Sequence, residues 1–177
     1  TNDYGSADYY YVNKSSLPKV YGGFNTSLSW KGFDLSAIFA YSIGGYIYNR
    51  DITMILHNGS LEGRDWSTEI LKRWTPDNRN TDVPALSTTT NNWNSASTRF
   101  LQNNSYMRLK NLTLSYNLPK QWISKLSLSS VQVYVQGDNL FTIHRNQGLD
   151  PEQGITGITY YRYPAMRTIS GGINVSF

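Results

Sequence analysis

Hydrophobic and polar residues alternate along five stretches of this chain. Side chains on a strand point to opposite faces at successive positions, so each stretch predicts a strand with one apolar face and one polar face. The predicted strands span about residues 20–30, 33–43, 105–118, 128–141 and 166–177. The pattern therefore places the chain in the all-β class, as an antiparallel sheet.

The last stretch alternates most regularly and ends on an aromatic residue. Its apolar row contains Gly171, Ile173, Val175 and Phe177, and polar residues or glycine occupy the positions between them. Strands of outer-membrane β-barrels alternate in this way, because lipid covers the outward face and water or a plug covers the inward face. The pattern predicts a transmembrane β-barrel. The same row is similar to the C-terminal signal that the barrel-assembly machinery reads, although plain lipid-facing alternation predicts the same residues.

The connections between the predicted strands are alternately short and long. Lys31-Gly32 predicts a two-residue hairpin turn, and a short turn follows Pro119. The other two connections are long loops, at about 44–104 and 142–165. Outer-membrane barrels have short periplasmic turns and long extracellular loops, so we expect both long loops to be extracellular.

One helix is expected inside the first long loop. Trp66, Ile70 and Trp74 recur at four-residue spacing, which places them on one face of a helix from about Trp66 to Thr75. Asp65 is the expected N-cap, and Pro76 is expected to end the helix.

Aromatic residues gather at the short-turn ends of the predicted strands, where barrels carry an interfacial girdle. The expected periplasmic girdle consists of Trp30, Phe33, Tyr116 and Trp122. Near the opposite end, Arg108 and Lys110 share the row of Leu112 and Leu114 on their strand. We therefore expect these two side chains to meet anionic groups of membrane lipid and lipopolysaccharide.

Five strands cannot close a barrel, and open sheet edges are not tolerated in hydrocarbon. No signal peptide is recognisable at Thr1. We therefore expect the chain to be the C-terminal part of a larger barrel, contributing about five of its strands, with the plug domain absent from this segment.

The composition of the chain argues against several other classes of protein. The chain has 177 residues, 39% hydrophobic, with a mean hydropathy of −0.47, and no apolar run approaches the roughly 20 residues of a spanning helix. The net charge of +4 comes from scattered Lys and Arg, which argues against nucleic-acid binding. Cysteine is absent, which excludes disulfides and thiolate metal sites.

Residues for catalysis are sparse. His57 and His144 fall in predicted loops, and no phosphate-binding loop, dinucleotide fingerprint or metal-ligand spacing is present. Asp150 and Glu152 flank Pro151, but a turn in which Asp150 accepts hydrogen bonds from local amides explains them better than a catalytic carboxylate pair. The sequence predicts neither an enzyme, nor a cofactor, nor a metal site.

The first long loop contains the candidate residues for contact with substrate or with a lid protein. They are Trp66, Trp74 and Trp93, whose rings can stack on the face of a sugar, and Asn91 near Trp93. Trp66 and Trp74 are also explained by packing of the loop helix onto the barrel rim, which leaves Trp93 as the better contact candidate. The same loops could instead bind a lid protein.

Nine short stretches, in order, resemble the C-terminal end of the SusC/RagA-type TonB-dependent outer-membrane transporters. They are PKVYGGF (18–24), WKGFDL (30–35), RWTP (73–76), DVP (82–84), YMRLKNL (106–112), YNLP (116–119), GDNLF (137–141), GLDPE (148–152) and GINVSF (172–177). The resemblance implies roughly the last fifth of a plugged, 22-stranded barrel. It also implies import of oligosaccharides or peptides across the outer membrane of a Gram-negative bacterium, a SusD-like surface lipoprotein as lid, and energy from the TonB complex through an upstream plug.

A second interpretation is a soluble carbohydrate-binding β-sandwich, whose exposed Tyr and Trp residues would bind sugar. A sandwich also alternates, but it would bury its apolar rows between two sheets. The location of those rows therefore distinguishes the two interpretations.

Overall fold

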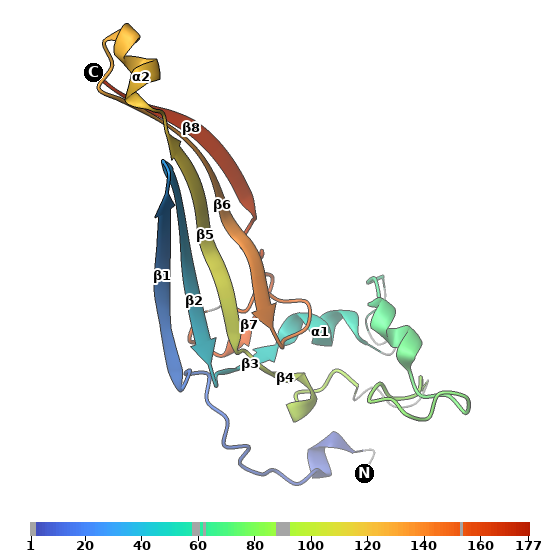
Figure 1. Cartoon of the computed structure of the whole chain (residues 1–177). Coiled ribbons are helices and arrows are strands. Elements are labelled where there is room, and N and C mark those ends of the chain that lie inside the picture. The colour runs from blue at the N-terminus through green and yellow to red at the C-terminus, as the bar shows by residue number, and fades with distance from the viewer. Residues whose placement is uncertain (1–2, 58–60, 62, 88–92, 153) are drawn as a thin grey trace.

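The computed structural model describes residues 3–57, 61, 63–87, 93–152 and 154–177. A long, curved antiparallel sheet dominates the structure (Figure 1). Its strand order is β1-β2-β5-β6-β8. The strands are β1 (Val20–Trp30), β2 (Phe33–Ile43), β5 (Tyr106–Asn117), β6 (Ser130–His144) and β8 (Thr168–Ser176). The expected antiparallel barrel segment is confirmed.

Short connections lie at one end of the sheet and the long loops lie at the other (Figure 1). Lys31 and Gly32 both have positive φ, 48° and 89°, which is the two-residue hairpin geometry that matches strand twist. At the same end, α2 (Lys120–Ile123) and the 3₁₀ turn η4 (Ser124–Leu126) join β5 to β6.

The loop end contains a separate layer of short elements, which begins with the 3₁₀ helix η1 (Tyr4–Ser6). A small sheet, ordered β4-β3-β7, is formed there by β3 (Tyr46–Asn49), β4 (Leu101–Asn103) and β7 (Ile158–Thr159). Three helices complete the layer: α1 (Arg50–Ile55) and the 3₁₀ helices η2 (Thr68–Lys72) and η3 (Thr98–Phe100). None of the described helices is long and apolar enough to cross a membrane.

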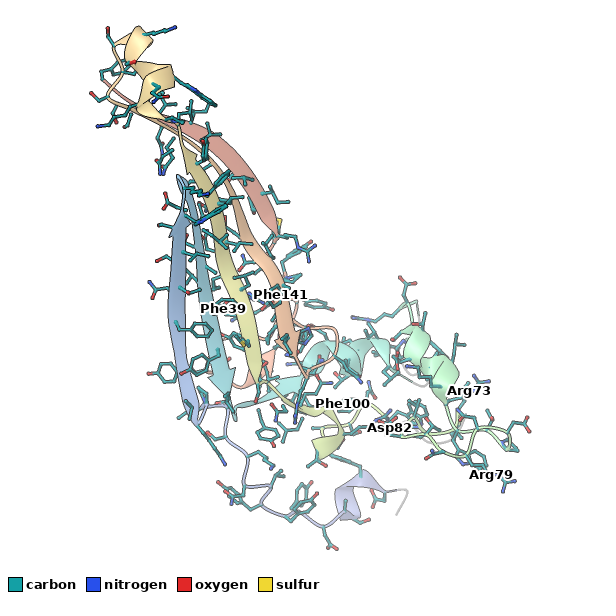
Figure 2. All side chains as sticks on the ribbon, in the orientation of Figure 1. Phe39, Arg73, Arg79, Asp82, Phe100 and Phe141 are labelled. Carbon is teal, nitrogen blue, oxygen red and sulfur yellow. The ribbon has the colours of Figure 1, made fainter. Side chains whose placement is uncertain are left out.

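The register aligns the apolar rows of all five strands on one face. Phe39 lies between Phe24 on β1 and Leu109 on β5, and Leu109 in turn pairs with Phe141 on β6. Val133 pairs with both Tyr116 and Ile173, which continues the row to β8. Figure 2 shows the side chains along the sheet, with Phe39 and Phe141 labelled.

This apolar face is uncovered. Large side chains on every strand of the sheet are exposed, among them Phe24, Leu28, Leu35, Leu114, Val135, Ile143, Ile169 and Ile173. No second sheet among the described residues packs over them, so the sandwich interpretation is wrong. An exposed apolar surface of this extent marks a face that contacts another protein or a membrane.

A β-bulge changes the face on which Arg108 lies. Ile38 pairs with Asn111, but Phe39 pairs with Leu109, so Lys110 is an extra residue in β5. An extra residue reverses the facing of everything beyond it. Arg108 therefore lies on the polar face, and it is buried. The expectation that Arg108 meets lipid headgroups is wrong for this reason.

Candidate functional site: the loop layer and its anchor on the barrel wall

Asn49 organises the loop layer at the start of α1. Its side chain accepts a hydrogen bond from Ile52 N (3.1 Å), which caps the helix, and its amide donates to Gln147 O (3.1 Å). Gln147 N donates to Gln102 Oε1 (3.1 Å). Asn49 is fully buried, so each bond replaces one that water would otherwise make. One amide side chain thus ties the first long loop to the second.

The predicted helix at Trp66–Thr75 is shorter than expected and is not α-helical. Ser67, and not Asp65, caps the 3₁₀ helix η2 by accepting from Glu69 N (3.2 Å). The helix ends at Lys72, whose carbonyl accepts from the side chains of Asn78 (2.9 Å) and Thr81 (2.6 Å). Those two side chains satisfy the helix end in place of a further turn.

Trp93 lies in a different environment from the one expected for a contact residue. It is only 8% exposed, in a hydrophobic cluster with Leu56, Ile70 and Val83. Arg99 lies over its ring, 5.4 Å from the centroid. Trp93 therefore forms the core of the loop layer, and the expectation that its ring is free to stack on a ligand is wrong. Asn91 lies outside the described residues.

Trp66 and Trp74 remain accessible on the loop layer. Each is a little over two-fifths exposed. Trp66 packs edge-on against His57, with the ring centroids 5.3 Å apart, and Trp74 N donates to Val83 O (2.7 Å). Both are anchored on one side and open on the other, and ligand contact by either remains a prediction.

A hollow of about 490 Å³ lies between α1, η2, η3 and the second long loop. Its lining includes apolar residues such as Ile52 and Phe100 and the polar residues Gln102 and Gln147. Charged groups of both signs line it: Asp51, Glu69, Lys72, Asp82 and Arg99. Figure 2 labels Phe100 and Asp82 in this layer. Burial lowers the pKa of Arg99, while Asp82 opposes that change.

An ion-pair cluster, which we call the clamp, fixes the second long loop to the polar face of the sheet. It consists of Arg108, Lys110, Asp150 and Glu152. Arg108 Nη2 donates to Asp150 Oδ1 (2.6 Å) and Nη1 to Glu152 Oε2 (2.8 Å), with side-chain exposures of 3%, 6% and 38%. Lys110 Nζ lies 2.7 Å from Glu152. Thr142 accepts from Arg108 Nε (2.8 Å).

Asp150 also holds the backbone of its own loop. Its carboxylate accepts from Glu152 N (2.8 Å) and from Ala165 N (2.6 Å). Burial raises the pKa of Asp150, but the amides of Ala165 and Glu152 and the side chain of Arg108 together lower it below its usual value. The sequence predicted the local turn and missed Arg108, because the bulge at Lys110 is not visible in the alternation.

The remaining candidate residues lie at the short-turn end. Trp30, Phe33 and Trp122 are exposed, and the Phe33 and Tyr116 rings are 4.5 Å apart. The predicted signal residues are Gly171, Ile173 and Val175 on the edge strand β8, and Phe177 directly after it. Val175 pairs with Val131, and Ile173 with Val133. Their roles as girdle and assembly signal stay predictions. Among the described residues, no group of three or more His, Asp or Glu side chains could hold a metal ion.

The sequence of this chain is similar to those of known TonB-dependent receptors. No protein-family model matches the chain. The chain is 35% identical over 166 residues to TonB-dependent receptor P3 of Formosa agariphila, across 88% of this chain and 16% of that receptor. It is 31% identical over 182 residues to TonB-dependent receptor P26 of the same organism, across 97% of this chain and 18% of that receptor. It is 27% identical over 168 residues to TonB-dependent receptor SusC of Bacteroides thetaiotaomicron, across 94% of this chain and 16% of that receptor.

Solved structures agree. The RagAB peptide importer in its open-open state superposes with a TM-score of 0.80 at 35% identity, across 94% of this chain and 18% of that chain. The structure of the RagAB peptide transporter superposes with a TM-score of 0.81, at the same identity and coverage. This chain therefore spans only 16–18% of the length of the curated relatives and structures it matches.

A curved antiparallel sheet with one uncovered apolar face, short turns at one end and structured loops at the other is a segment of a transmembrane β-barrel. Its relatives are receptors and importers. The chain belongs to the SusC/RagA type of TonB-dependent outer-membrane transporters, as a C-terminal segment of the barrel.

Proposed function

We propose that this chain supplies closing strands and outer loops to a barrel that imports oligosaccharides or peptides across the outer membrane. The observation that carries the proposal is the likeness to the RagAB peptide importer at a TM-score of 0.80. The uncovered apolar face supports it, because lipid would solvate that face. The proposal assigns the chain no catalysis, in keeping with relatives named as receptors and importers.

In this proposal, the loop layer faces outward and the short turns face the periplasm. Trp30, Phe33, Tyr116 and Trp122 then form the periplasmic girdle, where aromatic rings suit the membrane interface. The exposed faces of Trp66 and Trp74 are available to substrate or to a SusD-like lipoprotein lid. Energy would reach the barrel from the TonB complex through a plug upstream of this segment.

Uptake by the full-length protein in its membrane tests the proposal. A Gram-negative host that lacks its own importers for the supplied peptides or oligosaccharides would express the full-length protein together with the proposed SusD-like lipoprotein. Uptake is expected to require both the lipoprotein and an intact TonB. Uptake that persists at the same rate without TonB would contradict the proposal, as would recovery of the protein in the soluble fraction.

A further inference from the structure

A second hollow, of about 530 Å³, lies where the ends of β5 and β6 meet the second long loop. Arg108, Arg162 and Arg167 line it together with His144, and the one carboxylate in its lining is Asp150. By register, Arg108, Thr142 and His144 line the hollow from the polar face of the sheet, and Phe141, which belongs to the apolar row, also contributes to its lining. The charged and hydroxyl groups that the strands supply to the hollow therefore come from the polar face.

The charges of this lining are unbalanced. Asp150 is already neutralised, because it accepts from Arg108 at 2.6 Å and from two backbone amides. In the part of the chain that the structure describes, the ion pairs of this region are those of the clamp, and neither Arg162 nor Arg167 lies within 4.0 Å of a carboxylate. Arg162 and Arg167 therefore line the hollow without a carboxylate partner among the described residues, and both are exposed.

The backbone that carries these two arginines is fixed at three points. Tyr161 N donates to Asp51 Oδ1 (2.9 Å), and Ala165 N donates to Asp150 Oδ2 (2.6 Å). The side chain of Asn139 donates to Met166 O (3.2 Å). Little backbone entropy remains to be lost when a ligand binds between them, which is the condition for a preorganised site.

We propose that this hollow binds an oxyanion group, a carboxylate, sulfate or phosphate, that is carried by the imported substrate. Guanidinium groups pair with such anions through two parallel hydrogen bonds. The strand residues that bring polar groups to the hollow lie on the polar face, whereas lipid would meet the apolar face, so their position favours a substrate group over a lipid phosphate. The inference rests on the proposed import function and adds a preference for acidic substrates.

Binding to the purified full-length transporter tests this preference directly. The probes are fluorescent hexaglutamate and hexaglutamine, which have similar size and differ in charge. The variant R162Q/R167Q should bind hexaglutamate about tenfold more weakly than the parent protein, since two charge-assisted contacts are lost. Its affinity for hexaglutamine should not change, and raising the salt concentration should remove the difference.

A charge-matched control separates the site from net charge. The variant K120Q/K125Q removes the same two charges at the far end of the sheet and should leave hexaglutamate binding unchanged. Equal losses in both variants, or no loss in R162Q/R167Q, would overturn the proposal. Binding to vesicles of diphosphoryl lipid A tests the alternative source of the anion. If R162Q/R167Q binds these vesicles more weakly than the parent protein but binds hexaglutamate equally well, the anion is a lipid phosphate and the proposal is overturned. Uptake by the parent protein is measured separately: if it imports neither hexapeptide in a TonB-dependent manner, that result counts against the import function and not against the anion site.

Discussion

Replacing Arg108 with methionine should release the second long loop from the barrel wall. The substitution keeps an unbranched side chain and removes the charge that faces Asp150. Removing one partner of a buried ion pair costs about 3–5 kcal/mol, because the other charge is left buried. Two features of the structure favour the lower end of that range. Asp150 keeps its bonds to the amides of Glu152 and Ala165, and Glu152 is 38% exposed and keeps Lys110.

Hydrogen exchange on the full-length protein in lipid measures this effect where it arises. The amides of Glu152 and Ala165 donate to Asp150, so their protection reports whether the loop is closed. A loss of about 3 kcal/mol corresponds to roughly a hundredfold faster exchange, since 1.4 kcal/mol is tenfold. Strand amides of β5 should change far less, because the sheet hydrogen bonds remain.

Lys110→Met is the matched control. Lys110 is 35% exposed and pairs only with Glu152 among the described residues, and such an exposed pair contributes about 0–1 kcal/mol. Exchange should therefore rise less than about fivefold. If Lys110→Met and Arg108→Met accelerate exchange equally, or if neither does, the argument from burial is refuted.

The same clamp should loosen in acid. The pKa of Asp150 is lowered in the folded loop, so the carboxylate stabilises the closed loop fully above its ordinary pKa of about 4, and this contribution is lost as the pH falls toward the folded pKa. Loop exchange, corrected for intrinsic rates, should rise between pH 7 and pH 3. In the Asp150→Asn variant the loop amides should exchange rapidly at both pH values. Loop exchange in the parent protein that does not change with pH would contradict this account.

Two further substitutions and one deletion, with one control substitution, test other parts of the structure. Gly172→Ala should lower the urea midpoint of the folded barrel by the equivalent of about 1–3 kcal/mol, because the new methyl group would lie 2.7 Å from the Tyr134 hydroxyl; an unchanged midpoint would refute this. Deleting Phe177 should reduce insertion into the outer membrane while inserted barrels keep their heat stability, and normal assembly would exclude the signal role. Trp93→Ala should make the first long loop sensitive to protease, by loss of about 3–5 kcal/mol of packing, whereas Trp74→Ala should not.

The sheet could be predicted from the sequence because its determinants are local. Alternation at a period of two places successive side chains on opposite faces, and Lys31-Gly32 supplies the two positive φ values of the hairpin. β1 and β2 pair without interruption from Val20 with Ile43 to Trp30 with Phe33. Nothing beyond neighbouring residues is needed to predict that hairpin.

The loop layer could not be predicted, because distant residues hold it together. β3 has four residues and pairs with β4 and β7, which lie far along the chain. Asn49 caps α1 and also reaches Gln147. Trp93 follows a run of polar residues in the sequence, and only tertiary packing against Leu56, Ile70 and Val83 buries it. Periodicity carries no information about contacts of this kind.

The bulge at Lys110 explains why a regular pattern gave a wrong face for Arg108. Alternation predicts facing only within an uninterrupted register, and one added residue inverts every position beyond it. The partner strand bulges at the same level, where Asn139 adopts a positive φ of 52°. Without the bulge, Arg108 would join Leu112 and Leu114 on the apolar face. It would lie near the loop end of β5, where an arginine close to the membrane interface costs about 0–1 kcal/mol. With it, the Arg108 side chain lies on the polar face and pairs with Asp150, so one irregularity in the sheet both keeps the uncovered row apolar and anchors the second long loop.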